Sequence, residues 1–459
     1  MEIKIPVDVD LLLKYSKSGP RYTSYPTAPH FHDGIGAEEY IRHLTQDNTT
    51  IKNRNLSLYF HIPFCDTLCY FCGCHMTVSN NQKRIGQYLD YLEKEVDLTK
   101  NLIDPDRQVI QLHWGGGTPT HLSPEQIRRL GEFIRSRFEQ HPVAEISAEI
   151  DPRELTFDHL EALNEIGFNR VSMGVQTFDL TVQRAINRIQ PESVTRKAFE
   201  WSRSLGFSSQ NIDLMYGLPH QTISTLENTL DAVIDIDPNR IALFNYAHLP
   251  HVIRHQKLIK DEWLPDTPLK LQMLKLSIDK LQEAGYVFIG MDHFAKPDDE
   301  LTLALKDRTL YRNFQGYSTH AGINLLAFGV SSISMLSDLY VQNHKKFVDY
   351  YQALDQNQLP AMRGVALSPD DQLRRDVINR LMCHFYLDKK RIESEYQVRF
   401  DDHFYAPLQR IDKMQEDGLV IHDSDQITIT PAGRLLIRNI AMEFDAYLGQ
   451  TTHSYSRTI

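Results

Sequence analysis

The sequence has few cysteines, no long apolar run and no excess of positive charge. Only five of its 459 residues are cysteine, and no apolar stretch approaches the length that crosses a bilayer. The start, residues 1–22, carries charges and prolines rather than the apolar core of a signal peptide. These absences predict a cytoplasmic protein that is not associated with a membrane.

Basic residues are outnumbered by acidic ones, 49 to 60, which gives a formal net charge of −11. This balance argues against a broad nucleic-acid-binding surface, so any anionic ligand must meet locally placed bases. Hydrophobic residues make up 41% and charged residues 24%, which are globular values, and no low-complexity tract or short repeat is evident. The length predicts two or three domains.

The cysteines are concentrated in one place. Cys65, Cys69, Cys72 and Cys74 lie close together, whereas Cys383 stands in the apolar run 381–385. In a reducing compartment, such clustering favours metal ligation over disulfides. We expect Cys383 to be an ordinary buried core residue.

Short β-rich runs alternate with segments of helical periodicity over the first half of the chain. Strand followed by helix, repeated, predicts a parallel sheet with right-handed crossovers, in either a doubly wound sheet or a partial barrel. The predicted strands are Leu56–Pro63, Val109–His113, Glu145–Ile150, Arg170–Val175, Asn211–Met215 and Arg240–Asn245. The predicted helices include Arg84–Leu102, Pro124–Phe138, Glu192–Leu205 and Ser224–Ile236.

Polar or reactive residues follow all six predicted strands. In parallel α/β folds, ligands collect at the carboxyl ends of the strands. Taken singly, each of these residues is an ordinary turn residue, but their recurrence predicts a shared site. They are Cys65, residues 115–118, Glu149, Gln176, Asp213 and residues 246–248.

Beyond Pro360 the pattern changes to helices and a hairpin, as in a winged-helix module. The last helix offers only Arg434 and Arg438 beside Glu443 and Asp445, so we expect a packing or lid domain rather than a DNA-binding one. The predicted elements are helices Asp370–Tyr386 and Asp401–Asp417, strands Leu419–His422 and Ile427–Thr430, and a helix Ala432–Leu448 that begins after Thr430 and Pro431.

The cysteine spacing predicts an iron–sulfur site directly after the first strand. Cys65, Cys69 and Cys72, with three and two residues between them, can hold three corners of a 4Fe-4S cube and leave one iron open. An open iron can chelate S-adenosylmethionine and deliver one electron to its sulfonium. The alternative is a structural zinc site that includes Cys74, although only one residue separates Cys74 from Cys72.

Other strand ends carry groups suited to a nucleoside ligand. Glycines 115–117 allow close approach of a ligand and offer backbone N–H groups. Glu149 and Asp213 can accept hydrogen bonds from ribose hydroxyls or an ammonium group, and Gln176 and Arg188 can bind a carboxylate. Structural roles are at least as common for each residue taken singly.

Distinctive motifs occur along nearly the whole chain. They are YFHIPFC through Cys74, HWGGGTPT at 113–120, EIDPR at 149–153, SMGVQ at 172–176, NIDLMYGLP at 211–219, FNYAHLP at 244–250, MDHFA at 291–295 and NFQGY at 313–317. Together they resemble the oxygen-independent coproporphyrinogen III oxidase family of radical S-adenosylmethionine enzymes. Two further features, the amino-terminal segment 19–28 and the additional Cys74, resemble this family rather than other radical enzymes or heme-chaperone relatives.

This resemblance implies a partial (β/α)6 radical SAM barrel with an amino-terminal arm and a mostly helical, winged-helix-like carboxyl-terminal domain. The expected domains are 1–52, 53–360 and 361–459. It also implies a 4Fe-4S cluster on Cys65, Cys69 and Cys72, and two molecules of S-adenosylmethionine. Tyr59, Gly116, Glu149 and Ile333 would contact the first. The second would be surrounded by Phe71, Gly117, Thr118, Gln176, Arg188, Asp213 and Ala247.

The implied reaction converts two propionates of coproporphyrinogen III to vinyl groups, giving protoporphyrinogen IX in heme biosynthesis, after hydrogen abstraction by a 5′-deoxyadenosyl radical. Tyr59, Glu149 and Gln315 would be catalytic. The resemblance further implies a monomer served by an electron donor such as flavodoxin or ferredoxin.

The tetrapyrrole carries four propionates, so an acidic chain needs a few well-placed cations to receive it. Arg21, Arg312 and Lys296 are candidates, and Tyr22 and Gln315 are expected to face the substrate. Two other functions stay open from the residues alone: a heme carrier of related fold, and a zinc-stabilised, winged-helix DNA-binding regulator.

Overall fold

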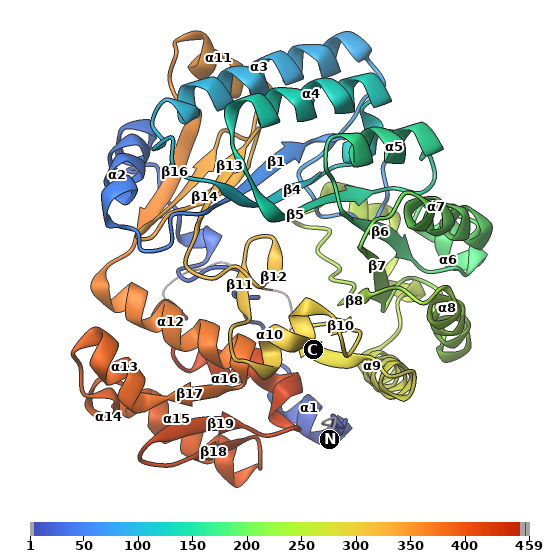
Figure 1. Ribbon diagram of the computed structural model, residues 1–459. Helices are drawn as coiled ribbons and strands as arrows, with labels where there is room; N and C mark the ends of the chain where they lie inside the picture. Colours follow the sequence, from blue (N-terminus) through green and yellow to red (C-terminus); the bar gives the residue numbers. More distant parts are fainter. Residues whose placement is uncertain (1–3, 450–454, 456–459) are drawn as a thin grey trace.

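The six predicted strands form the centre of one sheet in a computed structural model that describes residues 4–449 and 455 (Figure 1). They are neighbours in chain order and run parallel, as predicted. Their bounds are β1 Leu56–Ile62, β4 Val109–Gly116, β5 Gln140–Ile150, β6 Arg170–Gln176, β7 Ser209–Tyr216 and β8 Arg240–Asn245.

Helices connect these strands and follow the outer side of the curved sheet (Figure 1). α4 begins as its sequence predicts: Ser123 and Gln126 form a reciprocal capping box around Pro124 at the first helical position. None of the described helices has both the length and the apolar character needed to cross a membrane. The helices are α3 Gln82–Lys100, α4 Pro124–Arg137, α5 Phe157–Glu165, α6 Leu180–Ala185, α7 Glu192–Ser204 and α8 Ile223–Ile236.

The sheet extends beyond the predicted strands at both edges. β13 Asn324–Phe328 pairs in parallel with β1, and antiparallel strands follow it to one edge. At the other edge two antiparallel strands continue from β8, so the sheet is an open, partial barrel. The added strands are β14 Ile333–Met335, β15 Leu339–Asn343 and β16 Ala361–Ala366 on one side, and β10 His293–Ala295 and β9 Val287–Gly290 on the other.

The inserted elements on this frame are α9 Thr267–Glu283, α10 Glu300–Lys306, the hairpin of β11 Tyr311–Asn313 and β12 Gly316–Ser318, and α11 Phe347–Asp355. The amino-terminal arm carries α1 Val9–Tyr15 and α2 Ala37–Thr50.

The carboxyl-terminal region is mostly helical, as predicted, with a three-stranded sheet in the order β17, β19, β18. The predicted helix 401–417 is interrupted at Phe404, between α14 and α15. The elements are α12 Pro369–His384, β17 Tyr386–Asp388, α13 Lys389–Tyr396, α14 Phe400–His403, α15 Tyr405–Glu416, β18 Val420–His422, β19 Gln426–Ile429, the 3₁₀ turn η5 Gly433–Leu436 and α16 Ile437–Met442.

The predicted length of the last helix, 432–448, is wrong, because it opens as the 3₁₀ turn η5 and α16 ends at Met442. Beyond that residue the backbone forms tighter bonds, from Phe444 N to Ala441 O and from Asp445 N to Met442 O. The amide of Ala446 then donates to the hydroxyl of Tyr25 in the arm, at 3.0 Å. Contacts with the arm therefore replace the end of the helix.

The arm is fixed to the carboxyl-terminal region by buried polar contacts. The Arg438 guanidinium donates to the carbonyl oxygens of Pro20, at 3.1 Å, and Gly19, at 2.5 Å. The Tyr22 hydroxyl donates to Asp445 at 2.9 Å. Figure 1 likewise shows α1 beside the carboxyl-terminal elements. The two ends of the chain thus form one structure next to the barrel.

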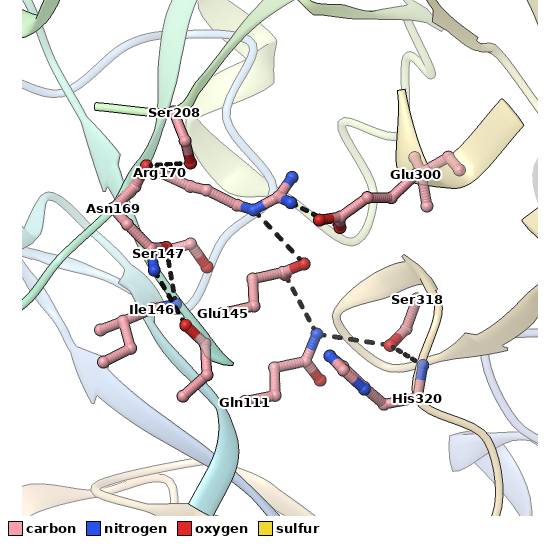
Figure 2. Close-up of polar contacts among 12 residues, drawn as sticks. Gln111, Glu145, Ile146, Ser147, Asn169, Arg170, Ser208, Glu300, Ser318 and His320 are labelled. Atoms are coloured by element: carbon pink, nitrogen blue, oxygen red, sulfur yellow. Dashed lines mark hydrogen bonds and ion pairs between the residues drawn. The ribbon is translucent and has the colours of Figure 1, made fainter. Parts of the chain in front are cut away.

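A polar network lies inside the barrel, toward the beginnings of the strands (Figure 2). Arg170, the first residue of β6, forms ion pairs with Glu145 on β5 and with Glu300 at the start of α10. The Gln111 amide donates to Glu145 at 3.2 Å and to Ser318 at 3.3 Å. Arg170 and Glu145 are largely buried, so their ion pair offsets part of the cost of burying each charge.

We expect Arg170→Met to lower the free energy of unfolding by about 3 kcal/mol, because it removes the ion-pair partner of the buried Glu145 carboxylate. The matched control is Arg128→Met, which removes the exposed Arg128–Glu165 pair between α4 and α5 and should cost about 0–1 kcal/mol. Urea unfolding of both variants measures the difference. Equal losses of unfolding free energy in the two variants would contradict a structural role for the network.

Candidate active site

The cysteine loop, residues 65–74, lies between β1 and the glycine-rich turn after β4. It is bounded by the short parallel strands β2 Phe64–Cys65 and β3 Thr77–Val78. The loop borders a cavity of about 290 Å³, here called the cysteine cavity, at the carboxyl ends of β4 to β7. The shared site predicted from the strand ends is therefore present.

Most of the predicted site residues line this one cavity. Those that the structure brings together there are Cys65, Cys69, Cys72, Phe71, Gly116, Gly117, Thr118, Glu149, Gln176, Arg188 and Asp213. Of these, Gln176 has a positive φ of 68°, a backbone conformation that is uncommon outside glycine. Such strain is found most often where function fixes a residue's position.

The cysteine sulfurs fit a cluster better than a single metal ion. Among residues 4–449 and 455, no three cysteine, histidine or carboxylate side chains are arranged to hold one ion. A cube binds each thiolate at a separate corner, so its ligands need not converge on one point. Cys74 lies beside Cys72, its backbone amide donating to the Cys72 sulfur at 3.4 Å. The predicted zinc alternative lacks its geometry here.

Two arginines surround the sulfur of Cys69. Arg153 Nη2 and Arg188 Nη1 each lie 3.7 Å from it, and both guanidinium groups also bind Asp151, at 2.7 Å and 2.9 Å. The shared carboxylate fixes the two cations in place, as second-shell groups do around metal ligands.

The glycine-rich turn packs directly on the cysteine loop. A Cβ at Gly117 would lie 2.7 Å from the carbonyl oxygen of Phe64, so only glycine permits this approach. The amides of Gly117 and Thr118 donate to Ile62 and Phe64, each at 2.8 Å. The prediction that the glycine N–H groups face a ligand is therefore wrong for Gly117, because its amide donates to the end of β1 instead.

Two carboxylates in the cavity differ in protonation. Burial would raise the pKa of Glu149, but hydrogen bonds from His113 and Gly116 bring that pKa below its usual value. Burial, and then the negative charge of Glu149, raise the pKa of Asp213 to about 7, against hydrogen bonds from Asn211 and Ser172. Near neutral pH, Glu149 is ionised and Asp213 can change its charge.

Four predicted residues lie outside the cysteine cavity. Tyr59 donates to or accepts from His61 at 3.1 Å, and with Ile333 it borders a small apolar cluster behind the site. Ala247 lines a neighbouring cavity. Gln315 is on the turn between β11 and β12, where its Nε2 is buried without a hydrogen-bond partner among the described residues.

Sequence reasoning missed the residues that hold the cysteine loop from the far side. Buried Gln256 donates to the carbonyl oxygens of Phe71, at 3.0 Å, and Ala247, at 3.3 Å. Its neighbour His255 binds the carbonyl oxygen of Cys72 at 2.7 Å. Both lie in the short 3₁₀ helix η3 Arg254–Leu258 after β8, which has too few turns to show a periodicity, so no sequence signal could have found them.

One of the three basic residues predicted to bind the substrate propionates, Lys296, does not lie near the site. Lys296 pairs with Asp237 and follows Ala295, which lies opposite Arg240 at the beginning of β8. The site lies at the other end of that strand, so Lys296 cannot reach it. Arg21 and Arg312 lie nearer to the site's side of the molecule, and both interact electrostatically with His293.

Two family models match the chain. The model for the radical SAM superfamily matches residues 59–233, and the HemN C-terminal domain matches residues 367–436. The radical SAM model extends from within β1 to within α8 and includes the cysteine loop. The HemN C-terminal model extends from just before α12 to the end of η5.

Relatives match from end to end. The oxygen-independent coproporphyrinogen III oxidase of Escherichia coli K12 is 47% identical over 99% of both chains, and that of Synechocystis is 44% identical over 97% of this chain and 96% of its own. The solved structure of coproporphyrinogen III oxidase (HemN) from Escherichia coli, described as a radical SAM enzyme, superposes with a TM-score of 0.92 at 46% identity, covering 97% of this chain and all of the other. The chain belongs to the oxygen-independent coproporphyrinogen III oxidase family of radical SAM enzymes.

Proposed function

We propose that this chain converts two propionate side chains of coproporphyrinogen III to vinyl groups by oxidative decarboxylation, giving protoporphyrinogen IX. The observation that carries the proposal is the cysteine cavity, where the cysteine loop, the carboxylates of Glu149 and Asp213 and a glycine-rich turn meet at the carboxyl ends of parallel strands. The alternatives of a zinc-stabilised regulator and a heme carrier are not favoured.

Cys65, Cys69 and Cys72 would hold a 4Fe-4S cluster. Together with S-adenosylmethionine, the cluster supplies radical chemistry that removes hydrogen from an unactivated carbon, which no side-chain base can do. The protein's own contribution is to bind, orient and exclude water. Arg153 and Arg188 each lie 3.7 Å from the Cys69 sulfur and would orient it toward the cluster.

The residues around the cavity divide into two predicted sets of S-adenosylmethionine contacts. Tyr59, Gly116, Glu149 and Ile333 form the first set, in which ionised Glu149 would accept from an ammonium group or ribose hydroxyls. The second set comprises Phe71, Gly117, Thr118, Gln176, Arg188, Asp213 and Ala247. Gln256 supports this second set because it binds the backbones of Phe71 and Ala247 at once.

Further properties are proposed from family membership. The chain would act as a cytoplasmic monomer that receives electrons from a donor such as flavodoxin or ferredoxin. A reducing compartment suits the four closely spaced cysteines, because cluster ligation requires free thiols. We propose that Tyr59, Glu149 and Gln315 are the catalytic residues.

The proposed function is tested by anaerobic turnover. Protein reconstituted with iron and sulfide, then supplied with a reductant, S-adenosylmethionine and coproporphyrinogen III, should form protoporphyrinogen IX and release carbon dioxide. Porphyrin chromatography after oxidation measures the product. Stable heme binding without any product would instead identify a carrier.

We expect Cys69→Ala to lose the cluster, because one corner of the cube would have no thiolate. Iron, acid-labile sulfide and visible absorbance of the anaerobic protein measure this directly, without an activity assay. Cys383→Ala is the matched control: Cys383 is fully buried in the core, away from the site, so this variant should retain iron and sulfide. Full cluster content in Cys69→Ala would rule out the proposed ligand set.

Asp213 should make binding of S-adenosylmethionine depend on pH. Its raised pKa of about 7 means that the carboxylate is mostly protonated at pH 6 and ionised at pH 8, and only the ionised form accepts two ribose hydrogen bonds. We expect affinity to rise by up to about tenfold between these values. Equilibrium dialysis should show this trend in the parent and none in Asp213→Asn; a flat parent profile would refute the assigned role.

A further inference from the structure

Two more cavities lie near the cysteine cavity. Phe244 lines the cysteine cavity, and its neighbours Asn245 and Ala247 line a second cavity of about 290 Å³. The second cavity shares Arg21, Tyr216 and Asn245 with a third, smaller cavity of about 40 Å³. The second cavity therefore lies next to both of the others.

The third cavity, here called the arginine pocket, is lined by Arg21, Arg434 and Arg438. Asp292 is its one carboxylate among the described lining residues, and it lies 3.7 Å from Arg21. Apolar side chains, including Phe288, form the remaining wall. The cations come from the arm, η5 and α16, which are brought together only by the complete fold.

Aromatic rings, rather than carboxylates, hold two of the guanidinium groups in this region. Arg434 stacks 4.4 Å from the ring centre of Phe385, and its buried Nε has no hydrogen-bond partner among the described residues. Arg312 is 6% exposed and stacks 4.8 Å from the ring centre of Tyr317, with its Nε and Nη1 likewise unpartnered there. Stacking leaves guanidinium N–H donors available for another ligand.

The arginines are close enough to affect one another. Burial and then repulsion from Arg21 lower the pKa of Arg438 to about 10; Asp292 opposes the shift and Arg312 adds to it. Burying cations in excess of anions costs free energy, which an anionic ligand would offset.

We propose that the arginine pocket binds a propionate carboxylate of coproporphyrinogen III other than the one being decarboxylated, and so directs a reacting propionate toward the cysteine cavity. This inference rests on the proposed function. About 40 Å³ accommodates a group of a few atoms, such as one carboxylate, while the apolar wall suits the adjoining methylenes. Arg312 extends the same positive region on the side of the β11–β12 hairpin.

The test measures anaerobic binding of coproporphyrinogen III to the reconstituted protein by ultrafiltration, with the retained ligand oxidised and quantified by fluorescence. We expect Arg434→Gln and Arg312→Gln each to weaken binding by about tenfold, because each removes a charge-assisted hydrogen bond. Arg308→Gln is the matched control. Its guanidinium also stacks on a ring, 3.7 Å from Tyr386, but it lies exposed outside the pocket, so affinity should stay within about twofold.

Stability provides a second readout that separates binding from structure. The buried Nε of Arg434 has no partner among the described residues, so Arg434→Gln should leave the thermal unfolding midpoint unchanged or raise it while affinity falls.

The parent should also bind the tetramethyl ester of the substrate more weakly than the free acid. In Arg434→Gln, the affinities for the ester and for the free acid should differ by less than they do in the parent.

Two results would contradict the proposal that this region binds a propionate. One is unchanged affinity for coproporphyrinogen III in both Arg434→Gln and Arg312→Gln, and the other is affinity that falls only together with the thermal unfolding midpoint. Failure of the proposed function gives a different result: the parent would bind coproporphyrinogen III without forming product. Weaker binding by Arg434→Gln and Arg312→Gln would still support the pocket in that case.

Discussion

The site depends on one constraint: the cysteine loop must keep a fixed shape while its sulfurs stay free to ligate. The protein meets it by binding the loop through its carbonyl oxygens. Thr77 N donates to Pro63 at 2.7 Å, and the Asn187 amide donates to Leu68 at 2.8 Å. Because these donors come from several elements around the barrel, the parallel sheet itself sets where the three sulfurs lie. The glycine-rich turn completes the arrangement, since any larger residue at position 117 would push the loop away.

Charge is arranged differently at the two ends of the barrel. Near the strand beginnings, buried Arg170 forms ion pairs with Glu145 and Glu300, so the network holds the strands and α10 together. At the carboxyl ends, ionised Glu149 helps to raise the pKa of Asp213, which can therefore change its charge near neutral pH. A carboxylate with such a shifted pKa is typical of a binding site rather than of a structural network.

The sequence was sufficient to predict the six central strands because each is a β-rich run followed by a helix of clear periodicity. It also predicted the residues at the strand ends, since parallel topology alone brings Cys65, Glu149 and Asp213 together. It could not predict β13 as a further parallel strand, because a five-residue buried run has no distinguishing period. The role of Gln256 could not be predicted either, because it arises from two contacts with backbone carbonyl oxygens that only the folded chain creates.

The carboxyl-terminal region shows how tertiary structure gives charged side chains partners that the local sequence does not indicate. Arg434 and Arg438 stand near Glu443 and Asp445 in the sequence, and this balance predicted a packing or lid domain rather than a DNA-binding one. The carboxylates instead bind elsewhere, Glu443 to Arg410 and Asp445 to Tyr22, while both arginines turn inward. A region that merely packed against the barrel would gain stability from apolar residues at these positions. Retaining buried cations there is consistent with a fold that gives up some stability in order to receive an anionic substrate.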